Sequence, residues 1–322
     1  MKKILVIQTA FLGDVILATP LAENLKLTFP EAEIHFLVKK GNESLLMNHR
    51  SIHKVWVFDK KNGKMRNMWT LAKSFRQEGF DLVFNLHRFA SSGIIAALSN
   101  GKQLYGFKKN PFSFLYTQSF PHEIGNGQHE VDRNLSLLKP IGITHHNRRP
   151  LLFPSQVDQD KVASYQSEPY FCIAPASVWF TKQLPKSIWI ELVIALAAKG
   201  KVYVLGSPQD FELCQEIIVA SKTNSVNLAG ELSLLQSAAL MQKANRNFVN
   251  DSGPLHLASA VNAKVTAFFC STIPDFGFGP LSDEAEIRQT TENLSCRPCG
   301  LHGHMACPKG HFKCGNISVE FN

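Results

Sequence analysis

The chain has 322 residues, of which 44% are hydrophobic and 19% are charged. This balance is typical of a folded globular protein and excludes a disordered or collagen-like chain. No segment approaches the ~20 uninterrupted apolar residues that a membrane-spanning helix needs. At about 150 residues per domain, the length predicts two domains.

The chain is basic, with 34 Lys and Arg against 26 Asp and Glu and a net charge of +8. Such a surplus favours acidic partners, among them nucleotides, phosphorylated lipids, nucleic acid and an anionic membrane surface. The apolar run near the N-terminus is interrupted early by Gln8 and Asp14. It therefore predicts a buried first strand and not a signal peptide, and we expect a cytoplasmic protein.

Strand-like and helix-like segments alternate along the first half, as in a parallel sheet covered by helices. We expect strands at 3–8, 34–38, 55–58 and 82–86, and helices at 15–28, 65–78 and 91–98.

The same alternation begins again after a polar stretch with proline, residues 144–159. Here we expect strands at 170–174, 202–205, 246–249 and 265–269, and helices at 187–199, 211–221, 234–243 and 255–261. The predicted fold class is α/β, with two Rossmann-like, doubly wound domains, 1–155 and 156–322, facing a cleft. Ligands of such sheets bind beyond the carboxyl ends of the strands.

The loop after the first strand ends in Gly13 and Asp14 and lacks the glycine spacing of a dinucleotide or nucleotide-hydrolase loop. One interpretation makes Asp14 a base that takes a proton from an attacking hydroxyl. The alternative is an ordinary helix N-cap.

In the second half, Asn250 to His256 (N-D-S-G-P-L-H) follows a strand and opens a helix. Backbone N–H groups and the positive end of the helix dipole suit a phosphate there. In this interpretation Ser252 adds a hydroxyl, Gly253 lets the backbone approach closely, and Asp251 caps the helix or orients another ligand. A plain turn and helix start explains the same letters.

Two further loops of the second half lie at the expected ligand edge. Thr181 and Lys182 follow the first strand, where the lysine can neutralise a diphosphate or simply be solvated. Gly206 and Ser207 follow the next strand and are candidates to frame a base or ribose. In the first half, His87, Arg88 and Lys108 form a candidate surface for an acidic acceptor, although such cations are also common as solvated charges.

Four cysteines gather near the C-terminus: Cys296, Cys299, Cys307 and Cys314. Their spacing fits a structural zinc site, and reduced thiols or a local disulfide fit it equally well.

The ordered motifs resemble glycosyltransferase family 9, the bacterial heptosyltransferases of the lipopolysaccharide inner core. The resemblance rests on G-D-V-I-L-A-T-P from Gly13, D-L-V-F-N-L from Asp81, H-E-V-D-R-N from His129, A-P-A-S with T-K-Q-L-P up to Pro185, and N-D-S-G-P-L-H-L-A-S-A from Asn250. It extends over nearly the whole chain. Two positions depart from the commoner family pattern, Ser252 and the pair His87-Arg88. Because of the change at His87-Arg88, the resemblance does not determine which acceptor is bound.

This resemblance implies a GT-B-like enzyme with the acceptor in the first half and a nucleotide-sugar in the second. It makes Asp14 the catalytic base, Lys182 the diphosphate ligand, and Asp251, Ser252, Gly253 and His256 the donor loop. The implied reaction is an inverting transfer from ADP-heptose, with no cofactor required. Asp158 and Asp160 fit a helix start better than a metal motif. The implied partners are an anionic lipid-linked saccharide and the inner membrane surface, bound peripherally.

Two other functions remain as alternatives. A nucleotide-sugar epimerase has the same architecture and would consume the donor without an acceptor. A nucleic-acid-binding protein is suggested by the charge and the Cys/His-rich tail, but the chain lacks a basic stripe, so we expect no nucleic-acid partner.

Overall fold

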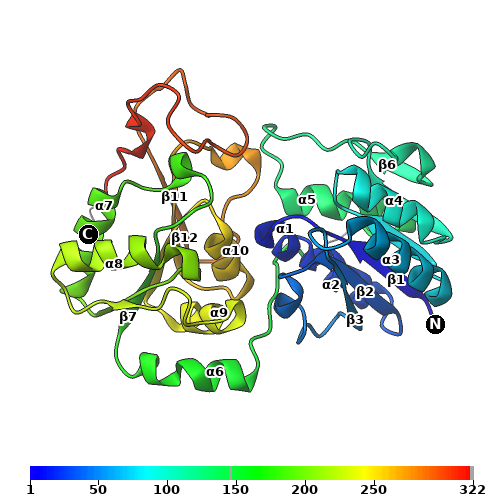
Figure 1. Ribbon diagram of the computed structural model, residues 1–322, viewed down its shortest axis with the longest axis horizontal. Coiled ribbons are helices and arrows are strands. Elements are labelled where there is room, and N and C mark those ends of the chain that lie inside the picture. The colour runs from blue at the N-terminus through cyan, green and yellow to red at the C-terminus, as the bar shows by residue number, and fades with distance from the viewer. Residues whose placement is uncertain (145–146, 320–322) are drawn as a thin grey trace. The chain divides into compact units, whose positions relative to one another are not determined.

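The computed structural model describes residues 1–144 and 147–319. The chain divides into two compact units (Figure 1). Unit 1 contains residues 1–124 and 128–153, and unit 2 contains the short piece 125–127 and everything from residue 154 onward. No helix of the described residues has the length and apolarity that crossing a bilayer requires.

Unit 1 is built on a sheet of six parallel strands in the order β3-β2-β1-β4-β5-β6. The strands are β1 (Lys3–Ile7), β2 (Glu33–Lys39), β3 (Lys54–Phe58), β4 (Leu82–Asn85), β5 (Gln103–Phe107) and β6 (Gln118–Phe120). The helices are α1 (Leu12–Ile16), α2 (Thr19–Thr28), α3 (Lys64–Glu78), α4 (Ala90–Leu98) and α5 (Glu130–Leu135).

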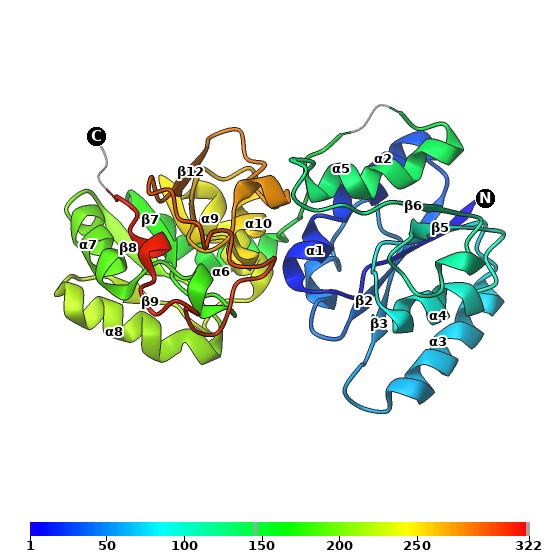
Figure 2. The same ribbon diagram turned by 90° about the horizontal axis from the view of Figure 1, so that it is seen from above.

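Helices cover both faces of this sheet, with α2 and α5 on one side and α3 and α4 on the other (Figure 2). Because both faces are covered, β1 and β4 are buried along almost their whole length. Leu5, Ile7 and Val83 of the sheet pack with Phe75 of α3 and Ile95 of α4 in one apolar core.

Unit 2 repeats the design with the strand order β12-β11-β10-β7-β8-β9, again all parallel. Its strands are β7 (Tyr170–Ala174), β8 (Lys201–Val204), β9 (Val226–Asn227), β10 (Arg246–Asn250), β11 (Val265–Phe269) and β12 (Ala285–Gln289). Its helices are α6 (Gln156–Val162), α7 (Lys186–Ala197), α8 (Phe211–Ser221), α9 (Leu234–Lys243) and α10 (Gly253–Ala260). In Figure 1, α7 and α8 cover one face and α9 and α10 the other.

Short 3-10 turns complete the described elements. They are η1 (Glu43–Leu45), η2 (Ser113–Leu115), η3 (Ser136–Ile141), η4 (Ala163–Gln166), η5 (Phe180–Lys182), η6 (Pro208–Asp210), η7 (Pro274–Phe276) and η8 (Lys313–Gly315).

The predicted fold class of two Rossmann-like domains is confirmed. One segment that was predicted as a single helix forms two helices. The helix expected at 15–28 is divided into α1 and α2, with Pro20 at the second position of α2. Proline lacks an N–H and is favoured in a first helical turn, so it starts α2. Asp158 closes a capping box: its Oδ2 accepts from the N–H of Ser155 at 2.8 Å. The helix-start interpretation of this carboxylate is therefore correct.

Candidate functional site

Each sheet has a point at which its chain crossings change direction, and the candidate residues follow the strands on either side of it. In unit 1 this point lies between β1 and β4, and in unit 2 it lies between β7 and β10. Ligands of open parallel sheets bind outside the carboxyl ends of the strands at this switch point. Asp14 follows β1, His87 follows β4, Lys182 follows β7 and Asp251 follows β10.

Asp14 occupies the third position of α1, not the N-cap. Its Oδ2 accepts a hydrogen bond from the N–H of Phe11 at 3.2 Å, so the carboxylate reaches back to the residue before the helix. Phe11 has extended backbone and is the last residue before the helix, which therefore begins earlier than the sequence predicted. The contact with Phe11 uses only Oδ2. It is therefore compatible with a role in proton transfer, in which Oδ1 would accept the proton.

The pKa of Asp14 is suited to a base. Burial, and to a smaller extent the carboxylate of Glu130, raise this pKa to about 6. The N–H of Phe11 and the charge of Arg88 oppose this rise. A general base works best when its pKa lies near the working pH. At neutral pH Asp14 is therefore ionised yet still able to accept a proton.

Glu130, the acidic neighbour of Asp14, is held by two buried side chains. His122 Nε2 lies 3.0 Å from Glu130 Oε1, and Arg133 Nε donates to Glu130 Oε2 at 2.7 Å. Burial raises the pKa of Glu130, but hydrogen bonds and charge from His122 and Arg133 lower it overall. The negative charge of Glu130 is therefore fixed in place near Asp14. In the sequence, Glu130 was indicated only as part of the H-E-V-D-R-N motif.

Two lysines that the sequence did not single out lie near the loop after β1, which carries Asp14. Lys39 ends β2, and its Nζ is 4.4 Å from the centre of the Phe11 ring. Lys60 follows β3, and its Nζ donates to the carbonyl of Thr9 at 2.6 Å. Burial, and to a smaller extent the charge of Lys39, lower the pKa of Lys60 to about 8. The available signal was their position at the carboxyl end of β2 and shortly after the carboxyl end of β3.

His87 and Arg88 differ in what they can contact. His87 is buried, and its Nδ1 lies 2.9 Å from the hydroxyl of Thr9. Burial, and to a smaller extent the charges of Lys60 and Arg88, lower the pKa of His87 to about 3, so the ring is neutral at physiological pH. His87 thus supports the loop after β1, whereas partly exposed Arg88 carries the positive charge.

The other two predicted acceptor residues lie on neighbouring loops of unit 1. Gly13 is part of α1, and its carbonyl accepts the N–H of Leu17 at 2.9 Å. Lys108 is exposed and follows β5. The Asn110 side chain donates to the carbonyl of His87 at 3.0 Å, which ties the loop after β5 to the loop after β4. Contact of any of these residues with an acceptor stays a prediction.

In unit 2, Lys182 and Asp251 form an ion pair. Lys182 Nζ lies 2.8 Å from Asp251 Oδ2, and the two side chains are only 15% and 7% exposed. The hydroxyl of Thr272 donates to the same oxygen at 2.7 Å. An ammonium group has three donors, so Lys182 can keep Asp251 and still contact a phosphate oxygen.

Helix α10 begins directly after this pair. Ser252 is its N-cap, and its hydroxyl donates to the carbonyl of Asn250 at 3.4 Å and makes no capping bond. In the first turn Pro254 has no N–H, and the N–H of Leu255 donates to the carbonyl of Ser252 at 3.1 Å, so the N–H of Gly253 is the donor left without a helical partner. His256 lies on the buried side of α10. This helix start has the features of an anion site.

The loop that carries Lys182 is fixed to the end of β10. Asn250 Oδ1 accepts the N–H of Leu184 at 2.9 Å, and its Nδ2 donates to the carbonyl of Pro175 at 2.8 Å. One buried amide thus holds both ends of the loop. Thr181 is 1% exposed, and its hydroxyl accepts the N–H of His304 at 2.8 Å. Its side chain points into the protein, not toward solvent.

Gly206 and Ser207 follow β8, the neighbour of β7. A Cβ on Gly206 would lie 2.9 Å from the Cβ of Asp210, so the turn has no room for a side chain. Ser207 N–H and hydroxyl both donate to Asp210 Oδ2, at 2.8 and 2.6 Å. The pair therefore shapes a tight turn, and contact with a nucleotide stays a prediction.

The four C-terminal cysteines are free thiols. No three of these sulfurs lie within 4.8 Å of one another in the described chain. A tetrahedral zinc site, with Zn–S bonds of about 2.3 Å, would bring the sulfurs to about 4 Å apart. Zinc binding therefore stays a prediction that requires the sulfurs to move closer. Less than one zinc per chain in reductively purified protein would count against it.

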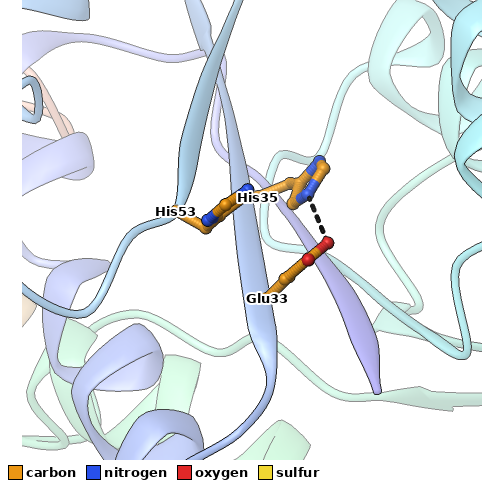
Figure 3. Close-up of side chains that lie close together, drawn as sticks. All are labelled: Glu33, His35 and His53. Atoms are coloured by element: carbon orange, nitrogen blue, oxygen red, sulfur yellow. Dashed lines mark ion pairs between the residues drawn. The ribbon is translucent and has the colours of Figure 1, made fainter. Parts of the chain in front are cut away.

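The described residues contain one group of three close ligand atoms, from Glu33, His35 and His53 (Figure 3). Trp56 Nε1–H donates to His35 Nδ1 at 3.0 Å, so the neutral ring carries its proton on Nε2, which lies 3.8 Å from Glu33 Oε2. Burial lowers the pKa of His35 to about 4, which keeps the ring neutral. Neither ring nitrogen of His35 then offers a lone pair to a metal. Glu33 begins β2 and His53 directly precedes β3, so this group lies at the amino ends of the strands, whereas Asp14 lies beyond the carboxyl end of β1.

Comparison with known proteins identifies the family. The family model "Glycosyltransferase family 9 (heptosyltransferase)" matches residues 68–305. Lipopolysaccharide heptosyltransferase 3 of Escherichia coli K12 is 27% identical over 300 residues, covering 88% of this chain and 83% of that protein.

Two solved structures share the fold. The structure of E. coli ADP-heptose lps heptosyltransferase II aligns with a TM-score of 0.79 and 23% identity, covering 93% of this chain and 96% of that one. E. coli heptosyltransferase WaaC with ADP aligns with a TM-score of 0.74 and 18% identity, covering 88% and 92%. Because the family model matches well over half of the sequence, the chain belongs to glycosyltransferase family 9 and is a glycosyltransferase.

Proposed function

We propose that the protein is an inverting glycosyltransferase that moves a heptose from an ADP-sugar to an inner-core lipopolysaccharide acceptor. The observation that carries the proposal is the placement of two complementary groups at the switch points of the two sheets. Asp14, with a pKa of about 6, follows β1, and Lys182 with the start of α10 follows β7 and β10. One group accepts a proton, and the other stabilises negative charge.

The donor is proposed to bind unit 2 through its diphosphate. Lys182 supplies a buried positive charge, and Gly253 allows a phosphate to approach the N-terminus of α10. Asp251 keeps the lysine in place and leaves two of its donors for the ligand. ADP as the nucleotide is supported by the relatives, whose names and ligands include ADP-heptose and ADP. Gly206 and Ser207 are proposed to frame the nucleoside.

The acceptor is proposed to bind unit 1. Arg88 and Lys39 place positive charge on Asp14, and Lys60 adds a further positive charge at the loop after β1. We propose that these charges attract an anionic saccharide and bring its hydroxyl to the base. A lipopolysaccharide core as acceptor is supported by the curated relative that acts as a lipopolysaccharide heptosyltransferase. Because this acceptor is lipid-linked, we propose peripheral association with the membrane that carries it.

The proposed reaction is a single displacement. The acceptor oxygen attacks the anomeric carbon as the bond from that carbon to the phosphate oxygen breaks. Asp14 takes the hydroxyl proton, and ADP leaves with the bonding electrons, stabilised by Lys182 and by the positive end of the α10 dipole with the N–H of Gly253. Attack from the face opposite the leaving group inverts the anomeric centre. Lys182 and the helix supply the positive charge that this step needs, so the proposed mechanism requires no cofactor.

The test combines a product assay with two variants. The purified chain is incubated with ADP-heptose and a heptose-less lipopolysaccharide, and the product is weighed by mass spectrometry and its anomeric configuration read by NMR. We expect one added heptose with inverted configuration. Asp14→Asn should keep ADP binding and lose most turnover, whereas Lys182→Ala should weaken ADP binding.

Two results would contradict the proposal. Conversion of the nucleotide-sugar to an isomer in the absence of any acceptor would favour the epimerase alternative. Transfer with retention of configuration, or full turnover by Asp14→Asn, would remove the single-displacement mechanism.

A further inference from the structure

The C-terminal tail after β12 returns to the loop that carries Lys182. In Figure 1 it is the orange and red segment of unit 2. Three stretches meet there: η5 with Lys182, the residues 270–272 that follow β11, and the tail residues 297–304. The contacts between them are hydrogen bonds to the main chain, so they fix backbone position and not only side-chain packing.

Thr181, the neighbour of Lys182, has all its polar groups engaged in this network. Its N–H donates to the carbonyl of His304 at 3.0 Å, and its hydroxyl accepts the N–H of His304 at 2.8 Å. Its carbonyl accepts the N–H of Ser271 at 3.2 Å. Since Thr181 is 1% exposed, water cannot replace these partners, and the main chain at Lys182 is tied to both other stretches.

The approach of the tail is so close that it requires glycine. A Cβ on Gly303 would lie 2.7 Å from Thr181 Oγ1, 2.9 Å from Ser271 Oγ and 3.2 Å from Lys182 Cγ. Gly303 also has φ of +74°, a conformation that residues with a side chain rarely adopt. The tail therefore packs directly on the stem of Lys182.

Arg297 anchors the other side of the network. Its guanidinium donates to the carbonyls of Phe269, Cys270 and Thr272, at 3.0, 2.7 and 2.8 Å. The N–H of Cys299 adds a bond to the carbonyl of Ser271 at 2.8 Å. A planar fork with several donors suits such a cluster of carbonyls, so Arg297 holds the end of β11 in one shape.

The end of β11 is connected in turn to the ion pair. The Thr272 hydroxyl donates to Asp251 Oδ2 at 2.7 Å, and the same oxygen lies 2.8 Å from Lys182 Nζ. Lys182 is thus fixed at both ends. Thr181 and Gly303 fix its main chain and stem, and Asp251 with Thr272 fixes its ammonium group.

We propose that the tail segment 297–304 is part of the donor site, and that Thr181 and Thr272 are positioning residues that place Lys182 for the donor diphosphate. This inference rests on the proposed role of Lys182. It reassigns Thr181, whose hydroxyl is directed to the tail, from a donor ligand to a positioning residue. A side chain placed in advance loses less entropy on binding, so the network raises the affinity for a diphosphate.

The test is a double-mutant cycle read by calorimetric titration with ADP on the full chain. Thr181→Val and Thr272→Val remove one hydroxyl each and keep the side-chain shape. Each is measured alone and together with Lys182→Ala. We expect each single variant to weaken ADP binding about fivefold, as one hydrogen bond does, and Lys182→Ala to weaken it about tenfold or more. With Lys182→Ala present, either threonine change should alter ADP affinity less than about twofold, because the group that they position is gone.

Two controls separate positioning from general damage. Thr181→Ser keeps the hydroxyl and should bind ADP as the unmodified chain does. Thr266→Val makes the same change at a buried threonine of β11, whose hydroxyl contacts Glu286 outside the network, and should also leave ADP affinity unchanged. The melting temperature of each variant shows whether it is folded.

The outcomes distinguish the inference from the function on which it rests. Unchanged ADP affinity in Thr181→Val and Thr272→Val, or an equal loss with and without Lys182, would overturn the positioning role. Unchanged ADP affinity in Lys182→Ala would instead overturn the proposed donor role of Lys182 itself.

Discussion

Lys182 Nζ and Asp251 Oδ2 lie 2.8 Å apart, in a pair that joins the loop after β7 to the loop after β10. Both side chains are largely buried, and the Thr272 hydroxyl is a further partner of the carboxylate. The lysine proposed to bind the donor is therefore also part of the folded structure of unit 2. Its removal has consequences for stability as well as for binding.

We expect Lys182→Ala to lower the free energy of unfolding by about 2 kcal/mol, because it leaves the Asp251 carboxylate buried without its cation. Adding Asp251→Asn removes that unpaired charge and should restore part of the loss, although ADP binding stays weak. Urea unfolding of both variants at neutral pH measures this. If adding Asp251→Asn lowered the free energy of unfolding below that of Lys182→Ala alone, the predicted coupling between the two residues would be contradicted.

Much of the fold could be predicted because the central strands are apolar runs. β7 and β11 have the expected bounds, and the predicted strand at 246–249 differs from β10 by one residue. The missed strands lie nearer the edges of the sheets. β12 reads A-E-I-R-Q and β9 has two residues, so neither has the apolar pattern of a buried strand. β12 and β9 form because they pair with β11 and β8, so the pairing partner and not the local sequence determines where they lie.

The candidate site could be predicted only where a residue directly follows a central strand. Asp14 and Lys182 meet that condition. Lys39 is the last residue of β2 and Lys60 follows the edge strand β3, and in the sequence a lysine at such a position looks like any solvated charge. The Thr181 contact with His304 joins residues more than a hundred positions apart, and no local pattern encodes it. Tertiary packing decides such contacts.

His35 predicts a loss of stability in acid. Burial lowers its pKa from 6.5 to about 4, so between these pH values the unfolded chain binds a proton that the folded chain does not. Stability therefore falls as the pH drops through this window, by at most about 3 kcal/mol. His35→Gln can still accept from Trp56 and does not titrate, so its urea midpoint should fall less between pH 7.5 and about 4.5 than that of the unmodified chain. Equal falls would show that His35 contributes nothing to the acid sensitivity.

Lys39 and Lys60 predict a defect that is specific to the acceptor. Lys60→Ala and Lys39→Ala each remove one positive charge from the edge of unit 1 that also holds Asp14. We expect the KM for the acceptor to rise about five- to tenfold for each, as for loss of a charged hydrogen bond, with the KM for the donor unchanged. Lys102→Ala removes an exposed lysine that pairs with Asp81 and serves as the matched control. A rise in the donor KM, or the same acceptor defect in the control, would count against this assignment.

Asp14→Asn should make the protein more stable and nearly inactive. The raised pKa of Asp14 means that the folded chain binds its proton more tightly than the unfolded chain does between pH 3.8 and about 6. Above this window the ionised carboxylate costs stability, so the neutral amide should raise the free energy of unfolding at pH 7.5 by about 1 to 2 kcal/mol, and the gain should shrink toward pH 4. Urea unfolding at both pH values measures the difference.

The same ionisation should govern the rate. A base acts only when deprotonated, so kcat/KM for the acceptor should rise with pH up to about 6 and then level. The Asn variant should lose at least about a hundredfold in turnover, as for loss of a general base, while ADP affinity remains. If Asp14→Asn is more stable but keeps its turnover, the ionised carboxylate destabilises the fold without acting as the base. An inactive variant of lower stability would instead show that Asp14 serves mainly to hold the loop between β1 and α1.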